Sequence, residues 1–145
     1  MLRLSTHITQ DIFEYSNNHP NIPNHMDSEQ TSNAVLLCNT ILEPIITKVG
    51  MRVDSGYRCP ELNLAVGGSL VPLSQHCLGQ ACDILPVNGM PLIVFFNKIR
   101  SLNLPFDQLI LEFTWVHISY SGKNMRHEIF QAYKDNKNKT LYKTI

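Results

Sequence analysis

Two histidines and an aspartate stand where they could bind a divalent metal ion. His76 precedes a predicted strand, Asp83 lies seven residues later within that strand, and His117 lies on a later strand. Two imidazoles and one carboxylate are a plausible three-ligand set for zinc, with a fourth position left for water. The same residues also fit a hydrogen-bonded histidine and an aspartate that caps a turn. Their spacing alone leaves both interpretations open.

Two cysteines flank these candidate ligands and offer a different ligand set. Cys77 follows the first histidine and Cys82 precedes Asp83, and thiolates bind zinc well. Along an extended segment, however, Cys82 points to the face opposite Asp83. A buried apolar cysteine fits that position. We therefore expect these cysteines to lie outside the metal site, and Gly79 to allow a tight turn before the strand.

Hydrophobic periodicity and turn residues predict the elements that must hold these side chains. Apolar residues at helical spacing predict a long core helix over 27–49, which Pro44 kinks and Gly50 ends. Ser5 or Thr6 is expected to cap a shorter helix before it, with Ile8 and Tyr15 among its inward side chains. Further helices are predicted at 60–66 and 91–102. Strands are predicted at 51–57, 80–85, 108–113, 115–120, 128–134 and 140–145, the last two as a hairpin.

This order of elements indicates an α+β domain. Helices that come before and between antiparallel strands are typical of a small antiparallel sheet packed against helices. A chain of 145 residues fits one domain of common size. We divide it into N-terminal helices (1–50), a core that carries the motifs (51–122) and a C-terminal hairpin (123–145).

Composition narrows the function classes. The chain is 43% hydrophobic, and its 12 basic residues balance 12 acidic ones, which disfavours a nucleic-acid-binding protein. Residues 123–145 are cationic, with six Lys and Arg against two Asp and Glu, and form either a solvated hairpin or a surface for a polyanion.

Four cysteines do not resemble a disulfide scaffold, so reduced thiols are expected. We expect neither membrane insertion nor a signal peptide, because the apolar stretch at 90–96 is short and the first residues lack an apolar run.

Longer motifs connect the candidate ligands to a known family. The pattern S-x-H-x-x-G-x-A-x-D runs from Ser74 to Asp83 and is followed by Trp115-Val116-His117. Together with the segments 55–60, 66–69 and 107–112, it resembles the zinc D-alanyl-D-alanine carboxypeptidase family. That family includes peptidoglycan peptidases and phage endolysins and shares its fold with the hedgehog signalling domain. The matching blocks cover about half of the chain, and they imply a hedgehog-like fold in its compact, single-domain branch.

The resemblance implies a zinc hydrolase site. His76, Asp83 and His117 would hold the ion, and water would be its fourth ligand. Zinc lowers the pKa of such a water and polarises the scissile carbonyl. A carboxylate must still take the proton of the water and pass it to the leaving amine. Glu112 is the candidate for this catalytic base.

The position of this base departs from the better-known relatives. Those place an acid three residues before the last histidine, where this chain has Thr114. Glu112 lies five residues before His117, and in one continuous strand the two side chains would point to opposite faces. We expect a tight turn at Thr114 and Trp115, which brings Glu112 opposite His117 on the same face.

Three further residues follow from the resemblance as candidates for substrate binding. Arg58 would grip a substrate carboxylate through its planar guanidinium, which a lysine does not copy. Ser74 would bond the substrate, orient the site or simply cap a turn. Gln108 would either support the site or be an ordinary polar residue of a strand.

The function implied is that of a zinc metallopeptidase that cuts the stem peptides of bacterial peptidoglycan. It would act either as a D,D-carboxypeptidase or as an endopeptidase of the endolysin type. We expect a phage-encoded enzyme, found in the host cytoplasm before lysis or carried in the virion. The alternative, motivated by Thr114, is an inactive zinc-stabilised binding module or structural module of the virion.

Overall fold

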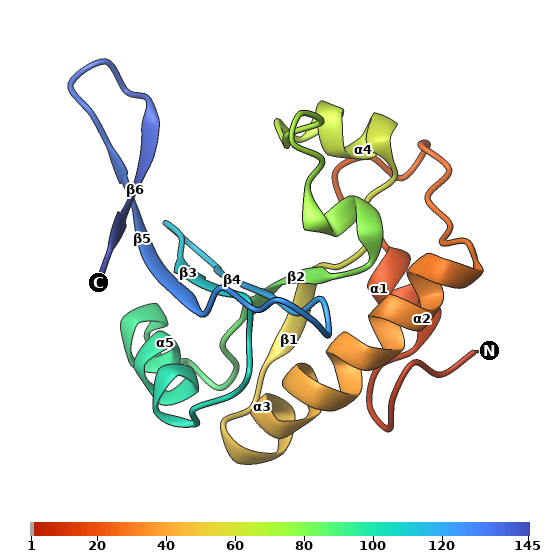
Figure 1. Ribbon diagram of the computed structural model, residues 1–145, viewed down its shortest axis with the longest axis horizontal. Coiled ribbons are helices and arrows are strands. Elements are labelled where there is room, and N and C mark those ends of the chain that lie inside the picture. Colours follow the sequence, from red (N-terminus) through yellow and green to blue (C-terminus); the bar gives the residue numbers. More distant parts are fainter. Residues whose placement is uncertain (1) are drawn as a thin grey trace.

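A computed structural model describes residues 2–145, and its centre is a six-stranded sheet (Figure 1). The strands are β1 (Arg52–Ser55), β2 (Ala81–Leu85), β3 (Gln108–Leu111), β4 (Val116–Ser119), β5 (Glu128–Lys134) and β6 (Thr140–Thr144). Their order in the sheet is β1-β2-β4-β3-β5-β6. The predicted strands and the α+β class are confirmed.

One strand pair differs from the antiparallel sheet that we expected. β3 and β5 run parallel, whereas the other neighbouring pairs are antiparallel. The reason is the position of β5, which lies on the far side of β3 instead of beside β4, the strand that precedes it. After β4 the chain must therefore pass β3 before it pairs again. β5 runs opposite to β4, and since β4 runs opposite to β3, β5 is parallel to β3.

Helices enclose the sheet on one face and border the other. They are α1 (Gln10–Glu14), α2 (Ser28–Leu37), the π-helical turn η1 (Cys38–Leu42), α3 (Glu43–Lys48), α4 (Pro60–Ala65), the 3-10 turn η2 (Gln75–Leu78) and α5 (Leu92–Ser101). In Figure 1 the run from α2 to α3 and the helix α5 lie on one side of the strands, and α4 with η2 lies on the other. Within residues 2–145, none of the helices combines the length and the apolar character that crossing a bilayer requires.

The long core helix follows the predicted range. Asp27 and Gln30 form a capping box at its start, in which each side chain bonds the backbone of the other residue. The expected kink at Pro44 takes the form of the wide turn η1 just before it. Proline lacks an N–H and its ring clashes with the carbonyl four residues earlier, so a regular α-helix does not run unbroken through it. Gly50, at φ 89°, ends the helix as predicted.

The first helix begins later than predicted. Ser5 and Thr6 lie before it in a bend, and its N-cap is Thr9, which pairs with Arg3 as an isolated β-bridge. This pairing extends the chain up to residue 9, so helix formation starts only at residue 10. Ile8 is buried as expected, but Tyr15 is exposed and does not face the core.

The two faces of the sheet differ in chemistry. One face is apolar and packs against α2, η1, α3 and α5, with Ile41 and Phe95 among the fully buried contacts. The strands contribute to this core Cys82, Ile84, Leu109, Leu111, Val116 and Ile118. Because side chains alternate along a strand, the residues between them point to the other face. That second face carries Asp83 and His117, so burial of the first face fixes the orientation of both.

Asp107 connects three segments around this second face. Its buried carboxylate accepts a hydrogen bond from Gln75 Nε2 at 3.0 Å, and bonds from Arg126 through the backbone N at 2.8 Å and through Nη2 at 2.9 Å. These bonds with Arg126 hold the pKa of Asp107 below its ordinary value, although burial opposes the shift. Asp107 thus ties η2 to the start of β3 and to the chain that enters β5.

Asn24 makes a second connection, on the side of Arg58. Its amide donates to the carbonyls of Glu14 at 2.7 Å and Tyr57 at 2.8 Å, and its oxygen accepts from the backbone N of Cys59 at 2.7 Å. The residue is only 6% exposed. Two of these partners flank Arg58, so Asn24 fixes the backbone that carries this side chain.

We predict that Asn24→Ala lowers the free energy of unfolding by about 2–4 kcal/mol, because buried backbone groups lose their partners. Asn18→Ala, at an exposed position of the same loop, is the matched control and should change it by less than about 0.5 kcal/mol. Urea unfolding followed by circular dichroism measures both. Equal, small effects of the two substitutions would contradict this role of Asn24.

Candidate metal centre

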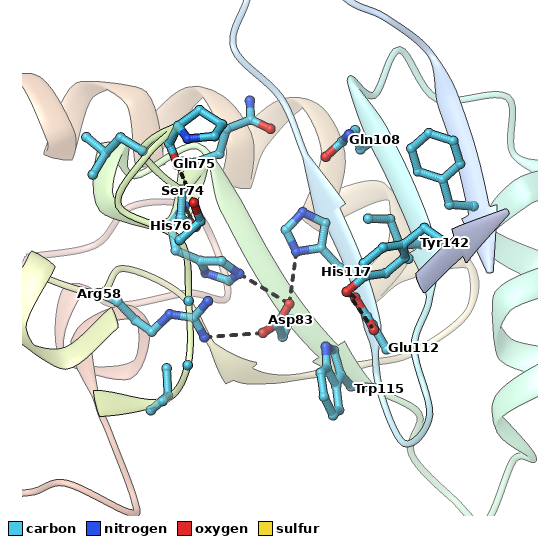
Figure 2. A pocket seen from close by; sticks show the side chains of 18 of the residues that line it. Arg58, Ser74, Gln75, His76, Asp83, Gln108, Glu112, Trp115, His117 and Tyr142 are labelled. Atoms are coloured by element: carbon cyan, nitrogen blue, oxygen red, sulfur yellow. Dashed lines mark hydrogen bonds and ion pairs between the residues drawn. The ribbon is translucent and has the colours of Figure 1, made fainter. Parts of the chain in front are cut away.

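A pocket of about 680 Å³ opens over the polar face of the sheet. Its lining combines the residues after α4 and in η2 with side chains of β2, β3, β4 and the C-terminal hairpin. Figure 2 shows His76, Asp83 and His117 pointing toward one another in this pocket. The structure therefore brings His117 together with His76 and Asp83, which lie in an earlier part of the chain.

The position of His76 is fixed by the 3-10 turn η2. Ser74 caps this turn by accepting a hydrogen bond from the backbone N of His76 at 3.2 Å. Gly79 ends the turn at φ 73°, and a Cβ there would lie 2.4 Å from a backbone oxygen of α2. The predicted tight turn at Gly79 is thus confirmed. Glycine is required there because the backbone has a positive φ and because a side chain would have no space.

The ring of His76 is oriented by a backbone carbonyl. Its Nδ1 lies 2.7 Å from the oxygen of Gly56. A carbonyl only accepts, so Nδ1 carries the proton in the neutral ring and Nε2 presents its lone pair to the pocket. This arrangement, in which the second ring nitrogen bonds a carbonyl, is typical of histidines that bind metals.

Asp83 and His117 are direct partners across two strands. The ladder between β2 and β4 pairs them, so both side chains rise from the same face. Asp83 Oδ1 lies 3.1 Å from His117 Nδ1 and 3.3 Å from His76 Nε2. The carboxylate is thus the common neighbour of the two imidazoles.

The donor set fits a zinc ion. One ligand atom from each of the three residues lies within 4.8 Å of the other two. Zinc bonds of about 2.0–2.1 Å place tetrahedral ligands roughly 3.3 Å apart, close to the separations around Asp83. His76 Nε2 and Asp83 Oδ1 lie 3.3 Å apart, so a cation held by both would have a nitrogen donor and an oxygen donor side by side.

The electrostatics of the site lower the pKa of both Asp83 and His76. Burial alone would raise the pKa of Asp83, but His76 and His117 outweigh it and hold that pKa far below its ordinary value. Burial lowers the pKa of His76, against the opposing effect of Asp83. A neutral imidazole beside an ionised carboxylate is the protonation state that metal binding requires.

Glu112 lies in the same pocket, although the predicted turn is displaced by one residue. Leu111 pairs with Val116, and the backbone N of Glu112 donates to the carbonyl of Trp115 at 3.0 Å. The tight turn is therefore centred on Phe113 and Thr114 instead of Thr114 and Trp115.

The displaced turn leaves Glu112 and His117 on the same face. Ile110 is the direct partner of His117, and Glu112 follows Ile110 by two residues, which makes it the diagonal neighbour of the histidine. Thr114 is exposed and does not line the pocket, whereas Glu112 does. The chain thus carries a carboxylate beside the donors without an acid at position 114.

The surroundings of Glu112 raise its pKa above the ordinary value of a glutamate. Burial raises its pKa, while a hydrogen bond from Tyr142 and the charge of His117 oppose the shift. The Tyr142 hydroxyl lies 3.2 Å and 3.5 Å from the two carboxylate oxygens. A carboxylate with a raised pKa is better matched to proton transfer near neutral pH.

Arg58 lies on the opposite side of the pocket from Glu112 (Figure 2). Its Nε donates to Asn63 Oδ1 at 3.0 Å, and its Nη1 lies 3.3 Å from Ser55 Oγ and 3.5 Å from Asp83 Oδ2. Asn63 is itself held by the carbonyl of Ser69 at 2.9 Å. These contacts fix the plane of the guanidinium at the edge of the donor set.

The remaining candidates take structural positions at the edge of the site. Ser74 and Gln108 both line the pocket, but Ser74 caps η2 and Gln108 Nε2 donates to Glu128 Oε1 at 3.0 Å. Cys82 is fully buried in the apolar core, on the face opposite Asp83 as predicted. Cys77 is buried too, and all four cysteines are free.

Sequence reasoning missed two residues that shape this site. Asn63 orients Arg58, and Tyr142 bonds Glu112. Tyr142 lies in a cationic, polar segment that resembles a solvated hairpin, and no motif marks it. Only the pairing of β5 with β3 brings it to the pocket.

Comparison with known proteins places these residues in a wider context. The sequence model of the family described as Peptidase M15 matches residues 17–119 of the chain. No curated protein matches the chain significantly. The matched segment contains His76, Asp83, His117, Arg58 and Glu112, and it ends before β5 and β6.

We predict that the protein binds zinc and that free zinc at 100 times its Kd stabilises the fold by about 2.7 kcal/mol. His76→Ala and His117→Ala should each abolish this gain, because two donors do not hold the ion tightly. Thermal unfolding with and without zinc, together with metal analysis after dialysis, measures both effects. His19→Ala, a histidine outside the site, is the control and should keep the full gain. Undiminished zinc binding in both site variants would contradict the assignment.

Proposed function

The chain belongs to the peptidase M15 family, the zinc D-alanyl-D-alanine carboxypeptidase type that its motifs indicated, and on that premise we propose that it hydrolyses a peptide bond in peptidoglycan stem peptides. The observation that carries the proposal is one pocket that holds three metal donors, a separate carboxylate and a fixed guanidinium. Each of these groups has one part to play in peptide hydrolysis.

His76, Asp83 and His117 would hold the zinc ion. When bound, zinc supplies Lewis acidity toward a peptide carbonyl and makes a water molecule acidic near neutral pH. The protein must then move one proton from the attacking water to the leaving amine nitrogen. Glu112 is placed to do this, because it lies on the same face as His117 and has a raised pKa.

Arg58 would recognise a carboxylate of the substrate. It lines the pocket across from Glu112, and Asn63 and Ser55 hold its planar fork in place. A guanidinium binds a carboxylate through two parallel hydrogen bonds, which gives direction as well as charge. We therefore propose that the scissile bond lies between Glu112 and a substrate carboxylate held by Arg58.

The nature of that carboxylate decides between two activities. A terminal carboxylate would make the protein a D,D-carboxypeptidase, and a side-chain carboxylate of the stem would make it an endopeptidase of the endolysin type. A phage-encoded or virion-carried enzyme, with peptidoglycan as its partner, belongs to the same proposal. A protein that binds zinc and wall fragments without cutting them would instead be the structural module.

Glu112→Gln tests the catalytic step. We predict that it lowers the rate of cleavage by about 10²–10⁴-fold, because an amide cannot accept the proton of the water. Mass spectrometry of purified peptidoglycan fragments after incubation identifies the bond cut and measures its rate. Zinc content should be unchanged in the variant. Full activity of the variant would remove Glu112 from the mechanism, and an inactive wild-type protein that binds zinc would support the structural module.

Arg58→Lys tests substrate recognition. We predict that this variant uses a free-acid substrate at least about tenfold less well, since a lysine loses the bidentate geometry. The matched measurement uses the same peptide with its recognised carboxylate amidated. The wild-type protein should discriminate against the amide, and the variant should discriminate much less. Equal discrimination by the two proteins would return Arg58 to a structural role as a partner of Asp83.

A further inference from the structure

The C-terminal hairpin forms one wall of the pocket. Phe130 of β5 and Tyr142 of β6 line it, although the two strands follow the segment that matches the family. In Figure 1 the hairpin lies at the end of the sheet away from β1, and its far end projects beyond the rest of the fold. The part of the hairpin that lies next to β3 is therefore the part that can contact the site.

The register of three strands brings Tyr142 to Glu112. Ile110 pairs with Phe130 in the parallel ladder, so Glu112 and Ala132, each two residues further on, share the same face. Ala132 in turn pairs with Tyr142 across the hairpin. Glu112, Ala132 and Tyr142 thus lie in one row across the sheet.

A small residue in the middle of this row leaves room for the contact. Ala132 is only 6% exposed and presents a methyl group, so the long side chains on either side of it can meet above it. The Tyr142 hydroxyl donates to Glu112 Oε1 at 3.2 Å and lies 3.5 Å from Oε2 (Figure 2). A larger residue at position 132 would separate them.

A second contact holds the hairpin against the same turn. The ammonium of Lys134 lies 5.3 Å from the centre of the Phe113 ring, which is the residue after Glu112. This distance is within the range of a cation–π interaction. The hairpin therefore contacts residues 112 and 113 from both of its strands, through Tyr142 of β6 and Lys134 of β5.

We propose that Tyr142 is a positioning residue for the catalytic base, which holds the Glu112 carboxylate in place through its hydroxyl. The inference rests on the proposed function, because it assigns Tyr142 a role through the base of that reaction. Burial and the neighbouring Glu112 raise the pKa of Tyr142 to about 12, so the hydroxyl stays protonated and able to donate. The hairpin thereby becomes part of the active site instead of a solvated appendage.

Tyr142→Phe removes the hydroxyl and keeps the ring. Tyr133→Phe is the matched control, since Tyr133 neighbours Ala132 in sequence but points to the other face of the hairpin and does not line the pocket. With the peptidoglycan fragment that the wild-type protein cleaves, Tyr142→Phe should lower kcat about tenfold, the lower end of what a hydrogen bond to a charged group contributes. KM should stay within about twofold of the wild-type value. Tyr133→Phe should change neither constant.

A second measurement does not depend on activity. Carbon-13 NMR of the Glu112 carboxyl group in metal-free protein gives its pKa, on which Tyr142, His117 of β4 and Asp83 of β2 act. The hydroxyl stabilises the charged carboxylate, so Tyr142→Phe should raise this pKa, and Tyr133→Phe should leave it unchanged.

The two measurements separate the possible failures. An unchanged Glu112 pKa in Tyr142→Phe would overturn the inference whatever the kinetics, because the hydroxyl would then not act on Glu112. A raised pKa with unchanged kcat would also overturn it, since the contact would exist without serving the reaction. A wild-type protein that cleaves no wall fragment would overturn the proposed function itself, and with it the assignment of Tyr142 to a catalytic base.

Discussion

The site depends on one buried carboxylate that must be neutralised where it stands. Asp83 lies on a strand whose other face is packed into the apolar core, so it cannot turn toward water without losing that packing. Its nearest neighbours are two imidazoles and the guanidinium of Arg58. The two imidazoles and the carboxylate converge closely enough to share one cation. The separations that η2, β2 and β4 impose on these donors are close to those of tetrahedral zinc ligands.

The fold meets this constraint by giving the two faces of the sheet different environments. The helices from α2 to α3 and α5 bury one face of the sheet, and the opposite face is left free for chemistry. Short bonded segments then bring the other groups to that face. Ser74 and Gly56 hold His76, Asn63 holds Arg58, and Asp107 ties η2 to the start of β3. Each group is thus fixed by a neighbour that takes no part in the proposed reaction.

The metal centre could be predicted from the sequence because the motif from Ser74 to Asp83 and the segment Trp115-Val116-His117 resemble a known family, whereas their spacing alone left the metal site open. Alternation within β2 places Cys82 opposite Asp83, and Gly79 marks the turn after His76. The shared face of Asp83 and His117 comes from the pairing of β2 with β4. The prediction misplaced the turn before β4 by one residue. Phe113 and Thr114, which form it, include no glycine or asparagine that would mark a tight turn in the sequence. Tyr142 could not be predicted at the site. Its place depends on β5 crossing to the far side of β3, a long-range pairing that no local pattern specifies.

The central claim is that two imidazoles and one carboxylate hold a zinc ion without any thiolate. X-ray absorption spectroscopy at the zinc K edge tests it most directly, on protein loaded with an equimolar amount of zinc. The account predicts a first shell of nitrogen and oxygen at about 2.0–2.1 Å, with the outer scattering of two histidine rings. A sulfur shell at about 2.3 Å would show a cysteine ligand and contradict it, as would zinc that remains fully hydrated.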